Sequence, residues 1–305
     1  MGLHFLRQGV LILGVLCGML LAGRAFAAPD ETVIFRYAPP ETNEVHFKMK
    51  SAVQSQGKTQ TQVLAGVFAM QVPRESNDLF HVETTLKEIR ITRNGLDLPD
   101  EVIDQLLGTS ISVATDNHGR VSDVKGDQIL RKRVRGHLLD DAMASLGYST
   151  NHDDLLWLTR RSWRERVTRF VGCKIKDGDI WIDTTEYLLL GQYHVPVYRA
   201  TRFEQSKAPG EGGVLHIKIT CNTTADGLAK SLGKTAKEII DAVDDPLPEN
   251  AEYRLIAEND MVLNPSTMAM SEEYSRIDAT HFILQRDKTR LPETITESME
   301  FRYGL

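Results

Sequence analysis

Cysteine is scarce in this chain of 305 residues, which has only Cys17, Cys173 and Cys221. Neither Cys173 nor Cys221 has a second ligand at the short spacing that zinc sites use, so the sequence predicts no metal site and no cofactor. The G-x-S-x-G motif of serine hydrolases is also missing, and the histidines are scattered along the chain. We therefore predict that the protein is not an enzyme.

Long apolar runs are rare as well. The best candidate for a membrane span, residues 10–22, has about 13 residues, which is shorter than the roughly 20 residues that cross a bilayer. Arg7 precedes this run and Ala25-Phe26-Ala27 follows it, which is the pattern of a secretory signal peptide. We predict a signal peptide over residues 1–27, cleavage between Ala27 and Ala28, and a mature chain without a transmembrane span in the periplasm or secreted. An uncleaved anchor is the competing interpretation.

Export limits the partners and the redox state of the mature chain. Its two cysteines, Cys173 and Cys221, are most simply paired in one disulfide in an oxidising compartment; two buried free thiols are the alternative. The formal net charge of the whole chain is -6. This acidic balance, together with export, excludes nucleic acid as the expected partner.

Alternating apolar and polar residues predict β-strands over most of the mature chain. Val45, Phe47 and Met49 fall on one face of a strand near residues 44–56, with His46 and Lys48 on the other. Strand patterns return after residue 173, and a helical insert is expected at residues 127–170. We predict an α+β fold in one domain, residues 28–305: a long-stranded, curved antiparallel sheet, forming a half-barrel or open barrel, with inserted helices.

Two short motifs carry a resemblance to a known family. They are a G-x-V-x-x-V-x-G hairpin and a G-D-x-W strand start, formed here by Gly119, Val121, Val124 and Gly126 and by Gly178, Asp179 and Trp181. They resemble those of an uncharacterised family of exported, β-rich bacterial proteins, which implies a β-rich fold and brings no activity or cofactor. The architecture is similar, by analogy, to envelope half-barrels that carry lipids or lipoproteins on a concave sheet.

The stretch DGLAKSLGKTAKEIIDAV, residues 226–243, resembles a phosphate-binding loop because it contains Gly-Lys-Thr. That loop needs G-x-x-x-x-G-K-[ST], and Leu228 stands where its first glycine belongs. We therefore predict no nucleotide partner and an amphipathic helix at residues 225–243 that covers the concave side of the sheet. Its groove-facing apolar residues are Leu228, Leu232, Ala236, Ile239 and Val243.

Basic residues are concentrated in the helical insert. Nine of them, nearly all arginine, lie between residues 131 and 169 against five acids. This run has three interpretations: a solvated face, a surface that docks on the acidic body of the protein, or contacts to an anionic surface or partner. The candidates for such contacts are Arg131, Lys132, Arg135, Arg160, Arg161, Trp163 and Arg164.

Together these patterns favour a non-catalytic periplasmic or envelope protein. We expect it to bind an apolar ligand such as a lipid, or a segment of an envelope partner, between the sheet and the helices. A structural or assembly factor without a small ligand is the alternative, and an unidentified hydrolase is the third hypothesis.

Overall fold

The computed structural model describes residues 33–34, 41–73, 79–134, 139–189, 193–206, 213–248, 252–263, 270–284 and 290–304. The predicted signal peptide lies outside these ranges. No helix in the part of the chain that is described is long and apolar enough to cross a membrane.

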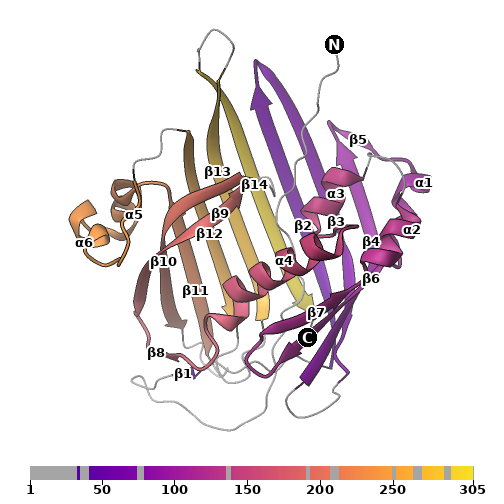
Figure 1. Cartoon of the computed structure of the whole chain (residues 1–305), viewed down its shortest axis with the longest axis horizontal. Coiled ribbons are helices and arrows are strands. Elements are labelled where there is room, and N and C mark those ends of the chain that lie inside the picture. The colour runs from indigo at the N-terminus through magenta and orange to yellow at the C-terminus, as the bar shows by residue number, and fades with distance from the viewer. Residues whose placement is uncertain are drawn as a thin grey trace.

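A single twelve-stranded antiparallel sheet forms the body of the protein (Figure 1). Its strand order is β7-β6-β4-β3-β2-β14-β13-β12-β11-β10-β9, and β5 pairs with β4. The sheet is curved and not closed, which confirms the predicted α+β fold with an open, long-stranded sheet. Its strands are β2 (Thr42–Ser55), β3 (Lys58–Gln71), β4 (Leu79–Arg93), β5 (Leu96–Asp97), β6 (Ser110–Asp116), β7 (Val121–Lys125), β9 (Ile180–Leu189), β10 (Tyr193–Ser206), β11 (Val214–Asn222), β12 (Tyr253–Leu263), β13 (Met270–Leu284) and β14 (Arg290–Gly304).

Two strands at opposite ends of the chain join the halves of the sheet. β2 pairs with β14, so that Phe47 lies opposite Phe301 and Met49 opposite Met299. A separate two-stranded sheet pairs β1 (Val33–Ile34) with β8 (Lys174–Ile175). The strand order ends at β7 on one side and at β9 on the other, and we call these two strands the free edges of the described sheet.

One face of the sheet is apolar because the side chains of a strand alternate between its faces. In β2, Val45, Phe47 and Met49 are buried while His46 and Lys48 are exposed, as the sequence predicts. We call the face that carries Val45, Phe47 and Met49 the inner face and the opposite one the outer face.

The helical insert, residues 127–170, covers the inner face. It contains α2 (Asp127–Arg133), α3 (Asp140–Ser145), α4 (His152–Trp163) and a π-helix, η1 (Arg164–Thr168). Asn151 caps α4 by accepting a hydrogen bond from the Asp153 amide at 2.9 Å, and Asp153 and Asp154 favour the positive end of the helix dipole. Figure 1 shows α4 lying across the front of the sheet. The short helix α1 (Asp100–Ile103) follows β5.

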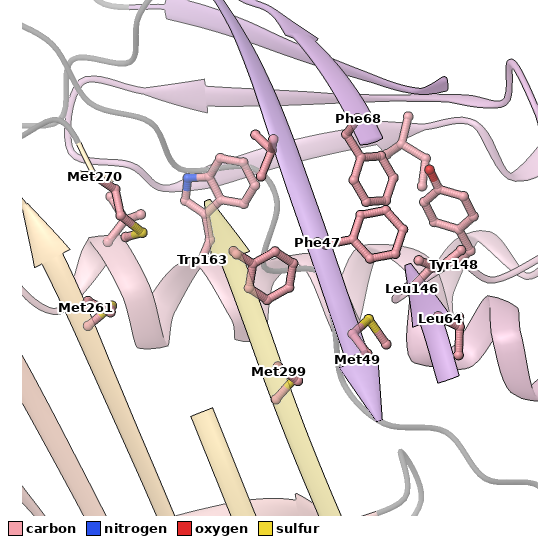
Figure 2. Close-up of a cluster of buried hydrophobic side chains, with 14 of the residues drawn as sticks. Phe47, Met49, Leu64, Phe68, Leu146, Tyr148, Trp163, Met261, Met270 and Met299 are labelled. Atoms are coloured by element: carbon pink, nitrogen blue, oxygen red, sulfur yellow. The ribbon is translucent and has the colours of Figure 1, made fainter. Parts of the chain in front are cut away.

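The inner face and the insert share one hydrophobic core (Figure 2). The rings of Phe47 and Phe68, on neighbouring strands, are tilted by 32° with their centroids 4.7 Å apart, and Tyr148 meets Phe68 edge-on at 6.5 Å. Trp163, at the end of α4, is buried in the same core. The insert is therefore held by aromatic packing at several points along the sheet.

The predicted covering helix is wrong in two respects. It is two helices, α5 (Ala225–Leu232) and α6 (Ala236–Ile240), because Gly233 ends α5 in a left-handed conformation and Thr235 caps α6 in a capping box with Glu238. Gly-Lys-Thr is thus the junction between two helices.

These two helices also cover the outer face and not the groove. Leu228 and Ile239 are buried against Tyr198 and Ala200 of β10, with Leu232 and Val243 half-buried around them. Ala236 is half-buried. Tyr198 and Ala200 alternate with Val195 and Val197, which belong to the inner core. The predicted apolar helix face is present, but it packs on the side of the sheet opposite the insert.

Replacing Phe68, which is 1% exposed, tests the shared core. We expect Phe68→Ala to lower the free energy of unfolding by about 3–5 kcal/mol because it leaves a cavity beside Phe47 and Tyr148. Lys48→Ala, on the outer face of β2, is the control and should change it by less than about 0.5 kcal/mol. Urea unfolding monitored by circular dichroism measures both, and equal effects would refute the assigned core.

Candidate functional site

A cavity of about 140 Å³ lies between the insert and the inner face of the sheet. Its roof is formed by Arg161, Ser162, Glu165 and Arg166, from the end of α4 and the start of η1. Strands β9 to β14 supply the walls and floor, whose lining residues are Thr185, Glu186, Tyr187, Arg199, Ile219, Cys221, Ala257, Glu258, Asn259, Met261, Ser275 and Met299.

The floor of this cavity is largely apolar. Ile219 comes from β11, Ala257 and Met261 from β12, and Met299 from β14. Methionine side chains are flexible and polarisable, so they adapt to occupants of different shape. The cavity thus combines an apolar floor with charged side chains, among them Arg161, Glu165 and Arg199.

Ion pairs join the roof to the sheet around the cavity. Arg199 of β10 makes two hydrogen bonds to Asp183 of β9, at 2.7 and 2.5 Å, and a third to Glu165 of η1. Arg166 of η1 donates to Glu273 of β13 at 2.7 Å. These pairs fix the position of η1 on the inner face.

The carboxylate of Glu273 is buried and accepts hydrogen bonds from two neighbouring side chains. Its side chain is 1% exposed, and besides Arg166 it accepts a hydrogen bond from the Asn259 amide at 2.8 Å. A buried carboxylate that loses its cationic partner is strongly destabilising, because neither water nor another charge compensates it.

We therefore expect Arg166→Gln to lower the free energy of unfolding by about 3–5 kcal/mol. The matched control is Arg276→Gln, which removes an exposed ion pair to Asp278 and should cost less than about 1 kcal/mol. Chemical denaturation of both variants makes the comparison, and a cost for Arg166→Gln as small as that of the control would contradict the buried pair.

Several polar atoms near the cavity have no hydrogen-bond partner among the described residues. They include Asn259 Oδ1, Ser275 Oγ and Glu297 Oε1. Glu297 lies on β14, two residues before Met299, and burial raises the pKa of its carboxyl to about 8. At neutral pH this carboxyl is therefore mostly protonated.

Glu297 makes the stability of the protein depend on pH. Its pKa is higher in the folded protein than its ordinary value of 4.5, so the folded state binds more protons between these two values. The free energy of unfolding should therefore fall as the pH rises from about 4.5 to about 8. Glu297→Gln should flatten this dependence and be more stable than the parent above pH 8 by roughly 1–4 kcal/mol.

Unfolding measured across this pH range tests the Glu297 prediction. Glu300→Gln, on the outer face of the same strand, is the control and should leave the slope between pH 4.5 and 8 unchanged. A Glu297→Gln variant with the parental slope would show that this carboxyl is ionised in the folded protein.

The predicted Cys173–Cys221 disulfide is not formed in the structure, where both cysteines are free thiols. Cys173 Sγ, just after η1, lies 3.5 Å from the carbonyl oxygen of Arg169. Cys221 points to the inner face and lines the cavity, and burial raises the pKa of its thiol to about 12. Cys173 is thus half-buried just after η1, whereas Cys221 is buried in β11 beside the cavity.

The arginine-rich run docks on the protein itself. Arg160 donates to the carbonyls of Val121 and Ser122 in β7, and Arg161 donates to the carbonyl of Glu186 in β9. Arg131 donates to the Thr150 carbonyl within the insert. This outcome was one of the three interpretations of the charge run. Lys132 is exposed, as is Arg164 with its ion pair to Glu165, whereas Arg135 lies outside the described residues.

Trp163 does not fit the prediction of a surface contact. Its side chain is 2% exposed because it packs into the core between the insert and the sheet. The exposed tryptophan of this helix is Trp157, whose ring lies 5.5 Å from the Arg161 guanidinium carbon.

Four cavity residues were not predicted from the sequence: Tyr187, Met261, Ser275 and Met299. One signal was present: in the alternation Ile295, Glu297, Met299, the acid occupies an inward-facing position. The described residues contain no cluster of three or more histidine, cysteine or acidic side chains that could hold a metal ion.

Comparisons with known proteins give fold-level likeness at most. No protein-family model matches the chain, and no curated protein matches it. It is similar to a solved structure of lipovitellin, described as showing lipid–protein interactions, with a TM-score of 0.45, 9% identity and coverage of 92% of this chain. The chain spans 26% of that lipovitellin chain.

Two further solved structures are more distant. The translocator domain of the autotransporter NalP from Neisseria meningitidis has a TM-score of 0.16 and 5% identity, with 86% of this chain and 88% of that chain covered. The MucA/MucB complex of Pseudomonas aeruginosa has a TM-score of 0.14 and 8% identity, with 84% and 88% covered. These scores are too low to assign a function, which has to come from the geometry of the cavity.

Proposed function

We propose that the protein is a non-catalytic binding protein of the cell envelope that holds an apolar ligand between the inner face and the α4–η1 segment. The observation that carries this proposal is the cavity floored by Ile219, Ala257, Met261 and Met299. Apolar pockets with a few convergent polar groups are the usual form of small-molecule sites. The predicted signal peptide supports the location in the periplasm or outside the cell.

The size of the cavity limits the ligand. At about 140 Å³ it is smaller than the roughly 300–1,000 Å³ of most ligand pockets. A ligand with a single slender apolar chain fits this space better than a bulky one, and rotation of the Met261 and Met299 side chains would enlarge it.

The polar roof suits a ligand with one polar end. Arg161 is bonded to a main-chain carbonyl, whereas Arg166 and Arg199 are held by carboxylates. Burial lowers the pKa of the Arg161 guanidinium. A polar or anionic head group beside Arg161 would compensate that charge, so the ligand class that fits best is a single-chain amphiphile such as a lipid.

A role in binding a partner segment is the second candidate. Leu155, Trp163, Val167 and Phe170 of the insert already fill much of the inner face. In this case no small ligand binds. The insert either covers the inner face permanently or is displaced from it by a segment of an envelope protein. The resemblance to exported β-rich proteins is compatible with both candidates.

Filling the cavity tests the first candidate. We expect cis-parinaric acid, a fluorescent fatty acid with one slender chain, to bind the parent protein and Met299→Trp to weaken its binding about tenfold or more, because the indole occupies the cavity. Ile256→Trp, at an exposed site on the outer face of β12, is the control. Ala257→Leu adds a smaller side chain to the same cavity and replaces Met299→Trp in the test if that variant does not fold.

Fluorescence titration measures the dissociation constants, and circular dichroism checks the fold of each variant. Equal binding by the Met299→Trp, Ala257→Leu and Ile256→Trp variants would place the probe elsewhere and reject the cavity as the ligand site. The absence of probe binding by the parent protein would favour the partner-segment role.

A further inference from the structure

Helix α4 connects the two free edges of the open sheet. Arg160 donates to the carbonyls of Val121 and Ser122 in edge strand β7, both at 3.2 Å. The next residue, Arg161, donates to the carbonyl of Glu186 in edge strand β9. The main-chain groups on the outer side of an edge strand have no neighbouring strand to bond with. Two adjacent arginines of one helix therefore provide hydrogen-bond donors to carbonyls on both free edges.

The buried side of α4 is small and polar compared with the segment that follows it. The buried residues of α4 are Leu155, Thr159, Ser162 and Trp163, and the Thr159 hydroxyl is satisfied within the helix by the carbonyl of Leu155 at 2.7 Å. Lifting the helix up to Ser162 would therefore expose one large, fully buried apolar side chain, Leu155.

The segment after α4 is anchored more firmly. Trp163, Val167 and Phe170 are almost completely buried, and Arg166 is paired with Glu273. The main-chain pattern also changes at this point, from the α-helix ending at Trp163 to the π-helix beginning at Arg164. Such irregular turns within helices are places where a helix bends, and they are frequent at functional sites.

We propose that α4 is a gate over the cavity, latched by Arg160 and Arg161 to the two free edges and hinged at its junction with the π-helix. Opening the gate lifts Arg161 and Ser162 off the cavity roof, while η1 stays bound to the sheet. The role of the gate in admitting a ligand rests on the proposed function, but its movement does not.

Cys221 reports on the gate directly. Its side chain is 5% exposed and lines the cavity beneath Arg161 and Ser162. With Cys17 and Cys173 replaced by serine, Cys221 is the only cysteine of the chain. The rate at which N-ethylmaleimide modifies it then follows the fraction of molecules with the gate open.

The test compares latch variants with a matched arginine variant in this single-cysteine background. We expect Arg160→Gln/Arg161→Gln to speed the modification of Cys221 about tenfold or more, since each lost charged hydrogen bond favours the open state. Arg160→Gln alone should show a smaller increase. Arg164→Gln is the control, because that side chain is 62% exposed and its ion pair is to the adjacent Glu165.

Amide deuterium exchange separates gate opening from unfolding of the whole protein. In the double variant, exchange should accelerate in residues 153–162 and stay unchanged in the central strands β2 and β14. Unchanged Cys221 modification in both latch variants overturns the proposal, and so does an equal acceleration of exchange in β2 and β14. Neither measurement contains a ligand, so failure of cis-parinaric acid binding would reject the proposed function and leave the gate standing.

Discussion

The inner face of an open, curved sheet has to be covered, and the fold is organised around this requirement. Apolar side chains such as Phe47, Phe68 and Phe301 line its concave side. The helical insert, residues 127–170, covers this face and packs Trp163 and Phe170 into the same core. The arginines of the insert then satisfy main-chain carbonyls at the free edges, which limits the pairing of exposed edges with other chains.

The contact between insert and sheet is both apolar and ionic, and the two parts have different consequences. Apolar packing supplies most of the stability, whereas buried ion pairs such as Arg166–Glu273 contribute little net free energy and instead specify position. Around the cavity this arrangement leaves polar atoms of Asn259 and Ser275 without partners in the described structure. A buried polar atom without a hydrogen-bond partner costs free energy, so these atoms lower the stability of the closed interface.

Much of the fold is readable in the sequence, because alternation and capping are local. The pattern around Phe47 predicts its strand and inner face, and the helical insert is recognisable from its apolar stripe and its acidic first turn. The cavity cannot be predicted from the sequence, since it brings together residues of strands far apart in the chain, such as Tyr187 of β9 and Met299 of β14. The position of α5 and α6 cannot be predicted from the sequence either. Their apolar side is evident from the residue spacing, but the face of the sheet that they cover depends on strand pairing.

The proposed function requires that the cavity beneath α4 and η1 hold an apolar ligand. Native mass spectrometry of the protein, isolated without detergent from the cells that produce it, tests this claim most directly. We expect a bound lipid of defined mass that is absent from the Met299→Trp variant and retained by the Ile256→Trp variant. Protein at its unliganded mass that also takes up no lipid from added vesicles would contradict it.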